Sequence, residues 1–327
     1  MKYGYLAGKS ILVTGGTGSF GRKCVRTLLK ESLARRIIIF SRDELKQSQM
    51  QSEFKEFDER LRFFLGDIRD RERLRVAFED VNYVVHAAAL KQVPALEFNP
   101  SEAILTNIIG TENVIRAALD KGVEKVLLIS TDKAASPANL YGATKLCAEK
   151  LTVSSNHYGV GKTLFSAVRY GNVLGSRGSL LQIIEEQRKT GTITLTHREM
   201  TRFWMTMDRG VDFVLSSLGR MKGAEIFIPK MPSMRVSELI HFMAPECEMR
   251  EVGIRPGEKM HEVLITPEEA RHAREFDDYY TIYPEFAFSG IGRELEGQPL
   301  LGTGPYLSHE NADWLDEARL KQLIATI

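Results

Sequence analysis

The stretch SILVTGGTGSFGRKCVRTLLKE near the amino terminus restricts the fold more than any other part of the chain. It joins a short apolar strand, a glycine turn and an amphipathic helix. Tight turns of many kinds use glycine, but here the glycines recur at every third position between a strand and a helix, which favours a dinucleotide site over an ordinary turn. One glycine makes the turn, another lets a pyrophosphate approach, and the last packs helix on strand. The predicted phosphate loop comprises Gly15, Thr17, Gly18, Ser19, Phe20 and Gly21.

Strand-like and helix-like segments alternate over residues 1–172. Strands are expected at 11–14, 36–40, 62–66, 82–89, 125–130 and 165–170, with helices such as 71–80 and 100–122 between them. This order predicts an α/β fold, a doubly wound parallel sheet with helices on both faces. We expect residues 206–230 to return to this sheet, and 173–205 with 231–327, ending in a helix at 318–327, to form a smaller C-terminal substrate-binding lobe.

Bulk composition excludes several classes of protein. The chain has 327 residues, 43% hydrophobic, with a formal net charge of +1, which gives no reason to expect nucleic acid or an anionic membrane as partner. No apolar run approaches the roughly twenty residues of a spanning helix. The three cysteines are scattered and the seven histidines lack ligand spacing, so we expect reduced thiols in a cytoplasm and no metal site.

The cofactor's ribose should lie about twenty residues beyond Gly21, where an NAD site usually offers an acid. This chain has Ser41 and Arg42 there, and the acidic residue Asp43 lies one position too far along the chain. Arg42 and Lys46 can flank a ribose phosphate, which predicts NADP over NAD. The alternative is that SRDELKQ is only a solvated, charged loop.

Tyr141 and Lys145 stand four residues apart in YGATKLCAEKLTVSSNHY, a stretch that reads as helix, so both lie on one face. A nearby ammonium, together with an oxidised nicotinamide, favours the phenolate and lowers the tyrosine pKa from about 10 toward neutrality. Tyr141 is then a candidate general base for a sugar or alcohol hydroxyl. Alone, the pair would more simply be a helix face.

TGGTGSFG, GDI, HAAA and Tyr141-x-x-x-Lys145 together resemble an extended short-chain dehydrogenase/reductase over essentially the whole chain. More narrowly, SRDELKQSQM, HAAALKQVPALEFNP, STDKA, NLYGATKLCAEK, RYGNVLGSRGS, MTRFW and RPGEK resemble the inverting UDP-N-acetylglucosamine 4,6-dehydratases, which start the route to pseudaminic acid. The resemblance implies a Rossmann fold, NADP, UDP-N-acetylglucosamine as substrate and a homo-oligomer.

The resemblance also implies further site residues. Those expected near the cofactor are Asp67, Ile68, Ala87, Ala88, Ala89, Lys91 and Ser130. Substrate contacts are expected from Lys91, Asn172, Arg177, Ser179, Arg202, Arg255 and Glu258, of which the two arginines at 202 and 255 also suit a diphosphate chemically. His86 reads instead as a core histidine on a strand. LLQIIEEQ and THREMTR depart from the family pattern and leave the fine sugar specificity open.

The residues suggest a reaction scheme. Tyr141 takes the proton from the hydroxyl at sugar carbon 4 as hydride passes to NADP, and the resulting ketone acidifies the proton at carbon 5. Asp132, next to Thr131, is assigned as the acid at carbon 6, and Lys133 as the base and reprotonating acid at carbon 5. For this role the pKa of Lys133 must fall from about 10.4. Retaining relatives have Thr-Asp-Glu here, so Lys133 favours inversion at carbon 5.

Three alternatives remain open at this point. An NADP-dependent UDP-sugar 4-epimerase needs Tyr141 and Lys145 but has no use for Asp132 and Lys133. A retaining UDP-sugar 4,6-dehydratase uses the same acid with another base. A non-catalytic dinucleotide sensor would need the glycine loop but not the reactive tyrosine.

Overall fold

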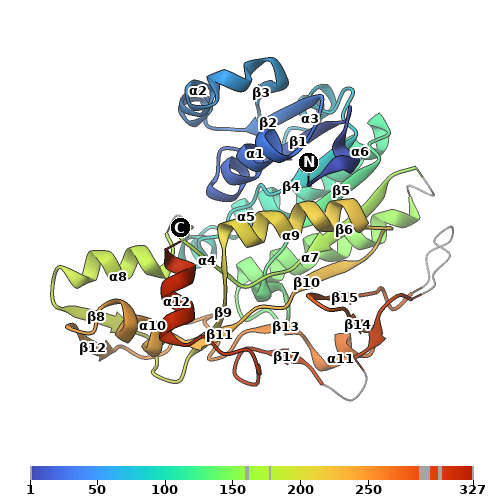
Figure 1. Ribbon diagram of the computed structural model, residues 1–327. Helices are drawn as coiled ribbons and strands as arrows, with labels where there is room; N and C mark the ends of the chain where they lie inside the picture. The colour runs from blue at the N-terminus through green and yellow to red at the C-terminus, as the bar shows by residue number, and fades with distance from the viewer. Residues whose placement is uncertain (1, 159–161, 177, 287–294, 301–303, 326–327) are drawn as a thin grey trace.

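The computed structural model describes residues 2–158, 162–176, 178–286, 295–300 and 304–325. Within them, the largest sheet has ten strands in the order β16-β14-β15-β10-β6-β5-β4-β1-β2-β3 (Figure 1). Neighbouring strands from β3 to β10 run parallel, whereas β15, β14 and β16 continue the sheet antiparallel. The parallel strands are β1 (Ser10–Thr14), β2 (Arg36–Ser41), β3 (Leu61–Leu65), β4 (Tyr83–His86), β5 (Lys125–Ile129), β6 (Leu164–Val168) and β10 (Ile226–Pro229); the antiparallel ones are β14 (Ala273–Glu275), β15 (Tyr279–Ile282) and β16 (Gln298–Pro299).

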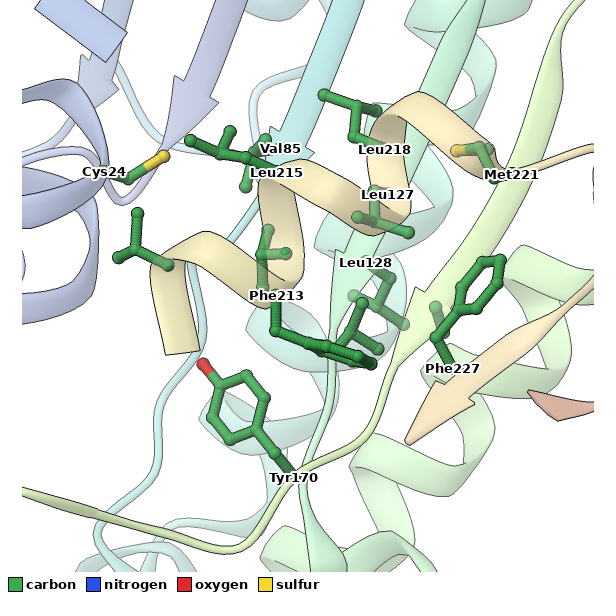
Figure 2. Packing of buried hydrophobic residues seen from close by; sticks show 14 of the residues in the cluster. Cys24, Val85, Leu127, Leu128, Tyr170, Phe213, Leu215, Leu218, Met221 and Phe227 are labelled. Atoms are coloured by element: carbon green, nitrogen blue, oxygen red, sulfur yellow. The ribbon is translucent and has the colours of Figure 1, made fainter. Parts of the chain in front are cut away.

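The parallel strands are apolar on both faces because helices cover both sides of the sheet. Successive side chains of a strand point to opposite sides. Ile37 and Ile39 of β2 join one core cluster, and Ile38 and Phe40 join the other. Helices α1 (Ser19–Glu31) and α9 (Met207–Arg220) pack together over the first face. Figure 2 shows Leu215 and Leu218 of α9 beside strand residues such as Val85.

The other face is covered by α3 (Arg71–Ala77) and α6 (Gly110–Lys121), and α7 (Leu140–Ser154) packs beside α6. Helices thus lie on both faces, and the predicted doubly wound α/β fold is confirmed. Further helices of this part of the chain are α2 (Glu44–Glu53), α4 (Val93–Phe98), α5 (Pro100–Ala103), η1 (Gly4–Leu6), η2 (Lys55–Arg60), η4 (Asp132–Ala134) and η5 (Ser155–His157).

Two local expectations need correction. The stretch 100–122 is not one regular helix, because a π-helical turn, η3 (Ile104–Ile109), separates α5 from α6. Residues 231–327 are not confined to a separate lobe, because β14, β15 and β16 belong to the main sheet. Short segments of this kind carry too little periodicity to reveal their pairing partners.

The remaining described elements gather beyond the carboxyl ends of the parallel strands, in the lower part of Figure 1. Three small sheets lie here, β11-β9-β7, β12-β8 and β13-β17. The first two lie around a third core cluster that includes Trp204 and Leu239, whereas Leu264 and Ile265 of β13 belong to the first cluster. Among the described helices, none combines the length and apolar character needed to cross a bilayer. The elements are β7 (Asn172–Leu174), α8 (Leu180–Arg188), β8 (Thr192–Leu195), β9 (Thr201–Thr206), β11 (Ser233–Arg235), α10 (Val236–Met243), β12 (Glu248–Glu251), β13 (Val263–Ile265), α11 (Pro267–Ala270), β17 (Tyr306–Leu307) and α12 (Glu317–Ile324).

Candidate active site

The glycine turn brings the start of α1 against the end of β4. Gly15 has a φ of +66°, and a Cβ there would lie 2.9 Å from the Cα of Ala88. A Cβ on Gly21 would lie 2.5 Å from the carbonyl oxygen of Gly15, so a side chain at either position would collide with backbone. Gly18 is the N-cap of α1 and supplies no side-chain cap, which leaves the helix amino terminus available to an anion. Thr17 is buried in the turn, while Ser19 and Phe20 open the helix.

His86 holds the HAAA segment in place from within the core. Its ring nitrogens lie 2.7 Å from the hydroxyl of Thr14 and 3.1 Å from that of Thr111. The Thr14 hydroxyl also accepts hydrogen bonds from the backbone amides of Ala87 and Ala88. Burial, with a smaller effect of the charge on Lys145, lowers the pKa of His86 to about 3. The prediction of a core histidine is confirmed.

The residues expected around the ribose are largely paired with one another. Ser41 is buried at the end of β2, and Arg42 lies 3.3 Å from the carboxylate of Asp67. Asp43 is the N-cap of α2 and lies 2.5 Å from the ammonium of Lys46. SRDELKQ is not a loop throughout, since it runs from the last residue of β2 into the first turn of α2. Burial opposes ionisation of Asp67, but hydrogen bonds from Arg69 and the charge of Arg42 hold its pKa below the usual value.

Thr131, Asp132 and Lys133 meet at the end of β5. Lys133 Nζ lies 3.0 Å from Asp132 Oδ1, which also accepts a hydrogen bond of 3.0 Å from the Thr131 hydroxyl. Asp132 is 1% exposed, and its Oδ2 has no hydrogen-bond partner among the described residues. The Ser130 hydroxyl is likewise buried and unpaired within the described part of the chain.

Gly142 lets α7 approach this turn closely. A Cβ at Gly142 would lie 2.1 Å from the carbonyl oxygen of Lys133, a distance that no side chain allows. The start of α7 is fixed by Asn139, which accepts a hydrogen bond from the Gly142 amide and donates one of 2.8 Å to the carbonyl of Gly257. The helix that carries Tyr141 is therefore held against both the Asp132 turn and the RPGEK loop.

Glu262, which sequence reasoning missed, completes the charged cluster. It immediately precedes β13, is 2% exposed, and its Oε1 lies 3.3 Å from Lys133 Nζ and 3.6 Å from Arg202 Nε. Arg202 is itself buried and lies 3.5 Å from Glu258. Only the neighbouring motif RPGEK could have drawn attention to Glu262.

The protonation of Lys133 differs from the expectation. Burial disfavours its ammonium, but the carboxylates of Asp132 and Glu262 outweigh burial and raise the Lys133 pKa. Burial, reinforced by the charge of Glu262 and opposed by Lys133, raises the pKa of Asp132. A role as base requires the pKa of Lys133 to fall, and the chain alone does not meet this condition, because Glu262 adds a second carboxylate beside the ammonium.

Tyr141 and Lys145 share the inner face of α7, as predicted. The ammonium of Lys145 donates a hydrogen bond of 2.6 Å to the carbonyl of Ile129, and burial lowers its pKa to about 8, opposed by Glu149. Burial raises the pKa of Tyr141 to about 12, while the charge of Lys133 and a hydrogen bond with Thr131 oppose the rise. The residues of the chain alone therefore do not lower the pKa of Tyr141 toward 7.

The other predicted substrate residues are more dispersed. Lys91 follows the HAAA segment. Partial desolvation of its ammonium, together with the charge of Lys133, lowers its pKa. Asn172 begins β7, and Ser179 is the N-cap of α8, with a buried hydroxyl that lacks a partner among the described residues. Arg255 is exposed in the loop before β13. Arg177 lies outside the described residues.

A second buried ion network, which the sequence did not indicate either, lies against α7. Arg169 is fully buried and contacts Glu149 of α7 at 2.6 Å and Glu269 of α11 at 2.8 Å. It also donates a hydrogen bond of 2.9 Å to the carbonyl of Leu264 in β13. One side chain thus connects the main sheet, the helix of Tyr141 and the segment that follows Glu262.

The parallel sheet, the glycine turn and the Tyr141–Lys145 helix define an extended short-chain dehydrogenase/reductase. The chain belongs to the polysaccharide biosynthesis protein family, whose profile matches residues 11–284. It is 46% identical to the UDP-N-acetylglucosamine 4,6-dehydratase (inverting) of Campylobacter jejuni, with 97% of each chain covered. It is 38% identical to the UDP-glucose 4-epimerase of Rickettsia rickettsii, over 98% of this chain and 96% of that one. Pen from Bacillus thuringiensis has a similar structure, with a TM-score of 0.90, 37% identity and 98% of each chain covered.

Proposed function

We propose that the protein is an NADP-dependent UDP-N-acetylglucosamine 4,6-dehydratase that inverts carbon 5 and yields the 2-acetamido-2,6-dideoxy-hexos-4-ulose of arabino configuration. The observation that carries the proposal is the ion pair of Asp132 and Lys133, at 3.0 Å, beside the α7 helix that bears Tyr141. A dehydratase needs an acid and a base in addition to the tyrosine. The name of the similar Campylobacter jejuni protein supports the same reaction.

The chain's own residues fit a dinucleotide. The cradle between Gly15 and Ala88 admits no Cβ, the α1 terminus is uncapped by side chains, and Ser130 offers an unpaired hydroxyl. Gly15 to Gly21 would hold the pyrophosphate, Asp67 and Ile68 would lie along the adenosine side, and Ala87 to Ala89 would follow the cofactor toward Lys145. When bound, the nicotinamide would accept a hydride from carbon 4 and return it to carbon 6.

Tyr141 is proposed to take the proton of the hydroxyl at carbon 4, with its phenolic oxygen hydrogen-bonded to the Thr131 hydroxyl. Asp132 is proposed as the acid that protonates the hydroxyl leaving carbon 6. Lys133 takes the proton from carbon 5 and later returns one to the opposite face. One proton transfer across the 3.0 Å ion pair, from Lys133 to Asp132, produces the neutral acid and neutral amine that these roles need.

The segments 173–205 and 231–327 are proposed to form most of the substrate wall. Arg202 and Arg255 are assigned to the diphosphate, Glu258 to the uridine, and Asn172, Arg177, Ser179 and Lys91 to the sugar and the cofactor. By the same resemblance we propose a homo-oligomer that works in the cytoplasm and supplies the route to pseudaminic acid.

A 4-epimerase is the second candidate, because similar Rickettsia proteins carry that name. Incubation with UDP-N-acetylglucosamine and mass spectrometry of the product separates the two. The proposal predicts a nucleotide sugar lighter by one water, whereas a product of unchanged mass with inverted carbon 4 would establish the epimerase instead. Retention at carbon 5 would leave dehydration intact and refute only the stereochemistry.

The choice of NADP rests on Arg42 and Lys46. A ribose phosphate must replace the ion pairs that these residues form with Asp67 and Asp43. We expect NADP to bind more tightly than NAD in a fluorescence titration. Arg42→Ala should weaken NADP by about tenfold, the value of one charge-assisted hydrogen bond, and leave NAD nearly unchanged. Tighter binding of NAD to the unaltered protein would contradict the assignment.

A further inference from the structure

Glu262 is a buried carboxylate that the reaction scheme does not use. Its position is fixed through the backbone, since its amide donates a hydrogen bond of 2.8 Å to the hydroxyl of Ser308 and its carbonyl accepts one of 2.9 Å from the Ser308 amide. Its side chain is 2% exposed, and its Oε2 has no hydrogen-bond partner among the described residues. A buried carboxylate in this state is costly unless nearby charges compensate it.

Lys133 is shared between Glu262 and Asp132, with its Nζ 3.3 Å from one carboxylate and 3.0 Å from the other. Two carboxylates that face one ammonium in a dry site do not ionise equally easily, because each charge opposes the other. Their other neighbours decide which one keeps the proton.

The surroundings of the two carboxylates are unequal. Glu262 also faces Arg202 at 3.6 Å and Lys259 at 3.8 Å, both cations of the substrate-side elements. Among the described residues, Lys133 is the only cation that forms an ion pair with Asp132, and the unpaired Oδ2 of Asp132 lies against the backbone at Gly171, where a Cβ would be only 3.3 Å away. The remaining ionisable groups around the cluster are Tyr141 from α7, Glu258 beyond Arg202, and His261, Arg169 and Lys91 at its edges.

We propose that Glu262 is a positioning residue of this active site: it remains ionised in contact with Lys133, and its negative charge beside Asp132 keeps the proton of the carboxylate pair on Asp132, the form that the acid role needs. The inference rests on the proposed function for its catalytic meaning. It adds a residue from the segment before β13 to an acid/base pair that otherwise comes from η4 alone. The directions of the pKa shifts agree, since Glu262 is held below its usual value by Lys133 and Arg202 against the effect of burial.

The test compares Glu262→Gln, which removes the charge, with Glu262→Asp, which keeps it, and with Glu268→Gln as a matched control on exposed α11. Protonation of Asp132 is followed by the infrared carbonyl band of its carboxylic acid, identified by its disappearance in Asp132→Asn. Without the negative charge at 262, the band should vanish at a pH lower by about one unit or more. Glu262→Asp and Glu268→Gln should titrate like the unaltered protein.

Turnover provides the second readout. Activity that requires protonated Asp132 falls as pH rises, so the descending limb of the kcat profile should move to lower pH in Glu262→Gln and return in Glu262→Asp. An Asp132 band that titrates at the same pH in Glu262→Gln and in the unaltered protein would overturn the inference. The infrared titration needs no turnover, so a failure of the proposed function, with no dehydrated product from the unaltered protein, stays distinguishable from a failure of this inference.

Discussion

At the scale of single residues, the proposed chemistry of the site depends on how Asp132, Lys133 and Glu262 share their protons. The sequence points to the first two because they follow a strand end and precede a Tyr-x-x-x-Lys helix. It does not reveal Glu262, which is about 130 positions away and reaches Lys133 only through the fold. For the same reason, the direction of the Lys133 pKa shift could not be predicted from neighbours along the chain.

Lys133→Ala removes the proposed base at carbon 5. We expect cofactor affinity to stay unchanged, because Lys133 is assigned to the sugar and not to the cofactor, while dehydration falls by about 10²-fold to 10⁴-fold, the usual contribution of a general base. Product formation is followed by mass spectrometry and cofactor binding by fluorescence. The exposed Lys55→Ala serves as control. Normal turnover in Lys133→Ala would remove the role assigned to this residue.

At the scale of elements, the strands and the glycine turn follow from local pattern, but their close contacts do not. The expected helix over 100–122 contains a π-helical turn, and Asn107 within it bonds both the amide and the carbonyl of Leu90. That turn aims a side chain at the loop after β4, as π-turns near functional sites often do. Apolar periodicity cannot distinguish such a turn from regular helix.

Gly142→Ala tests the close contact between α7 and the Asp132 turn. Alanine favours helix by up to about 1 kcal/mol, but its Cβ would lie 2.1 Å from the Lys133 carbonyl, so we expect a net loss of about 1–3 kcal/mol in unfolding free energy. Displacement of Lys133 should also reduce turnover by about 10²-fold. The measurements are urea unfolding and a turnover assay.

Gly210→Ala in α9 is the matched control, because its added Cβ would meet nothing closer than the Met205 sulfur at 3.7 Å. It should stabilise the protein by up to about 1 kcal/mol and leave turnover unchanged. If Gly142→Ala behaves like this control, the contact between α7 and η4 does not constrain the site.

At the scale of the whole molecule, the substrate-side elements are joined to the sheet by buried charge as well as by apolar packing. The alternation of strand-like and helix-like segments predicts the doubly wound sheet, but not the antiparallel strands β14 to β16 or the network of Arg169, Glu149 and Glu269. These contacts link positions up to 120 residues apart, from Glu149 to Glu269, and leave no local sequence signal.

Arg169→Met leaves Glu149 buried without its partner, so we expect a loss of about 3–5 kcal/mol in unfolding free energy at neutral pH. Exposed Arg75→Met should change it by less than about 1 kcal/mol. Burial opposes ionisation of Glu269, but Arg169 lowers its pKa, so this contribution is present above the unfolded pKa of about 4.3 and is lost as pH falls through the folded value. The difference between the unaltered protein and Arg169→Met should therefore shrink in acid, and a difference independent of pH would contradict this explanation.

In the proposed reaction, Tyr141, Asp132 and Lys133 act on one hexose. Incubation with UDP-N-acetylglucosamine in heavy water, followed by proton NMR of the product, tests it most directly. We predict a 4-keto-6-deoxy sugar that carries solvent deuterium at carbon 5 in the inverted, arabino configuration. A product with its original proton at carbon 5 and its hydroxyl still at carbon 6 would contradict the dehydration scheme.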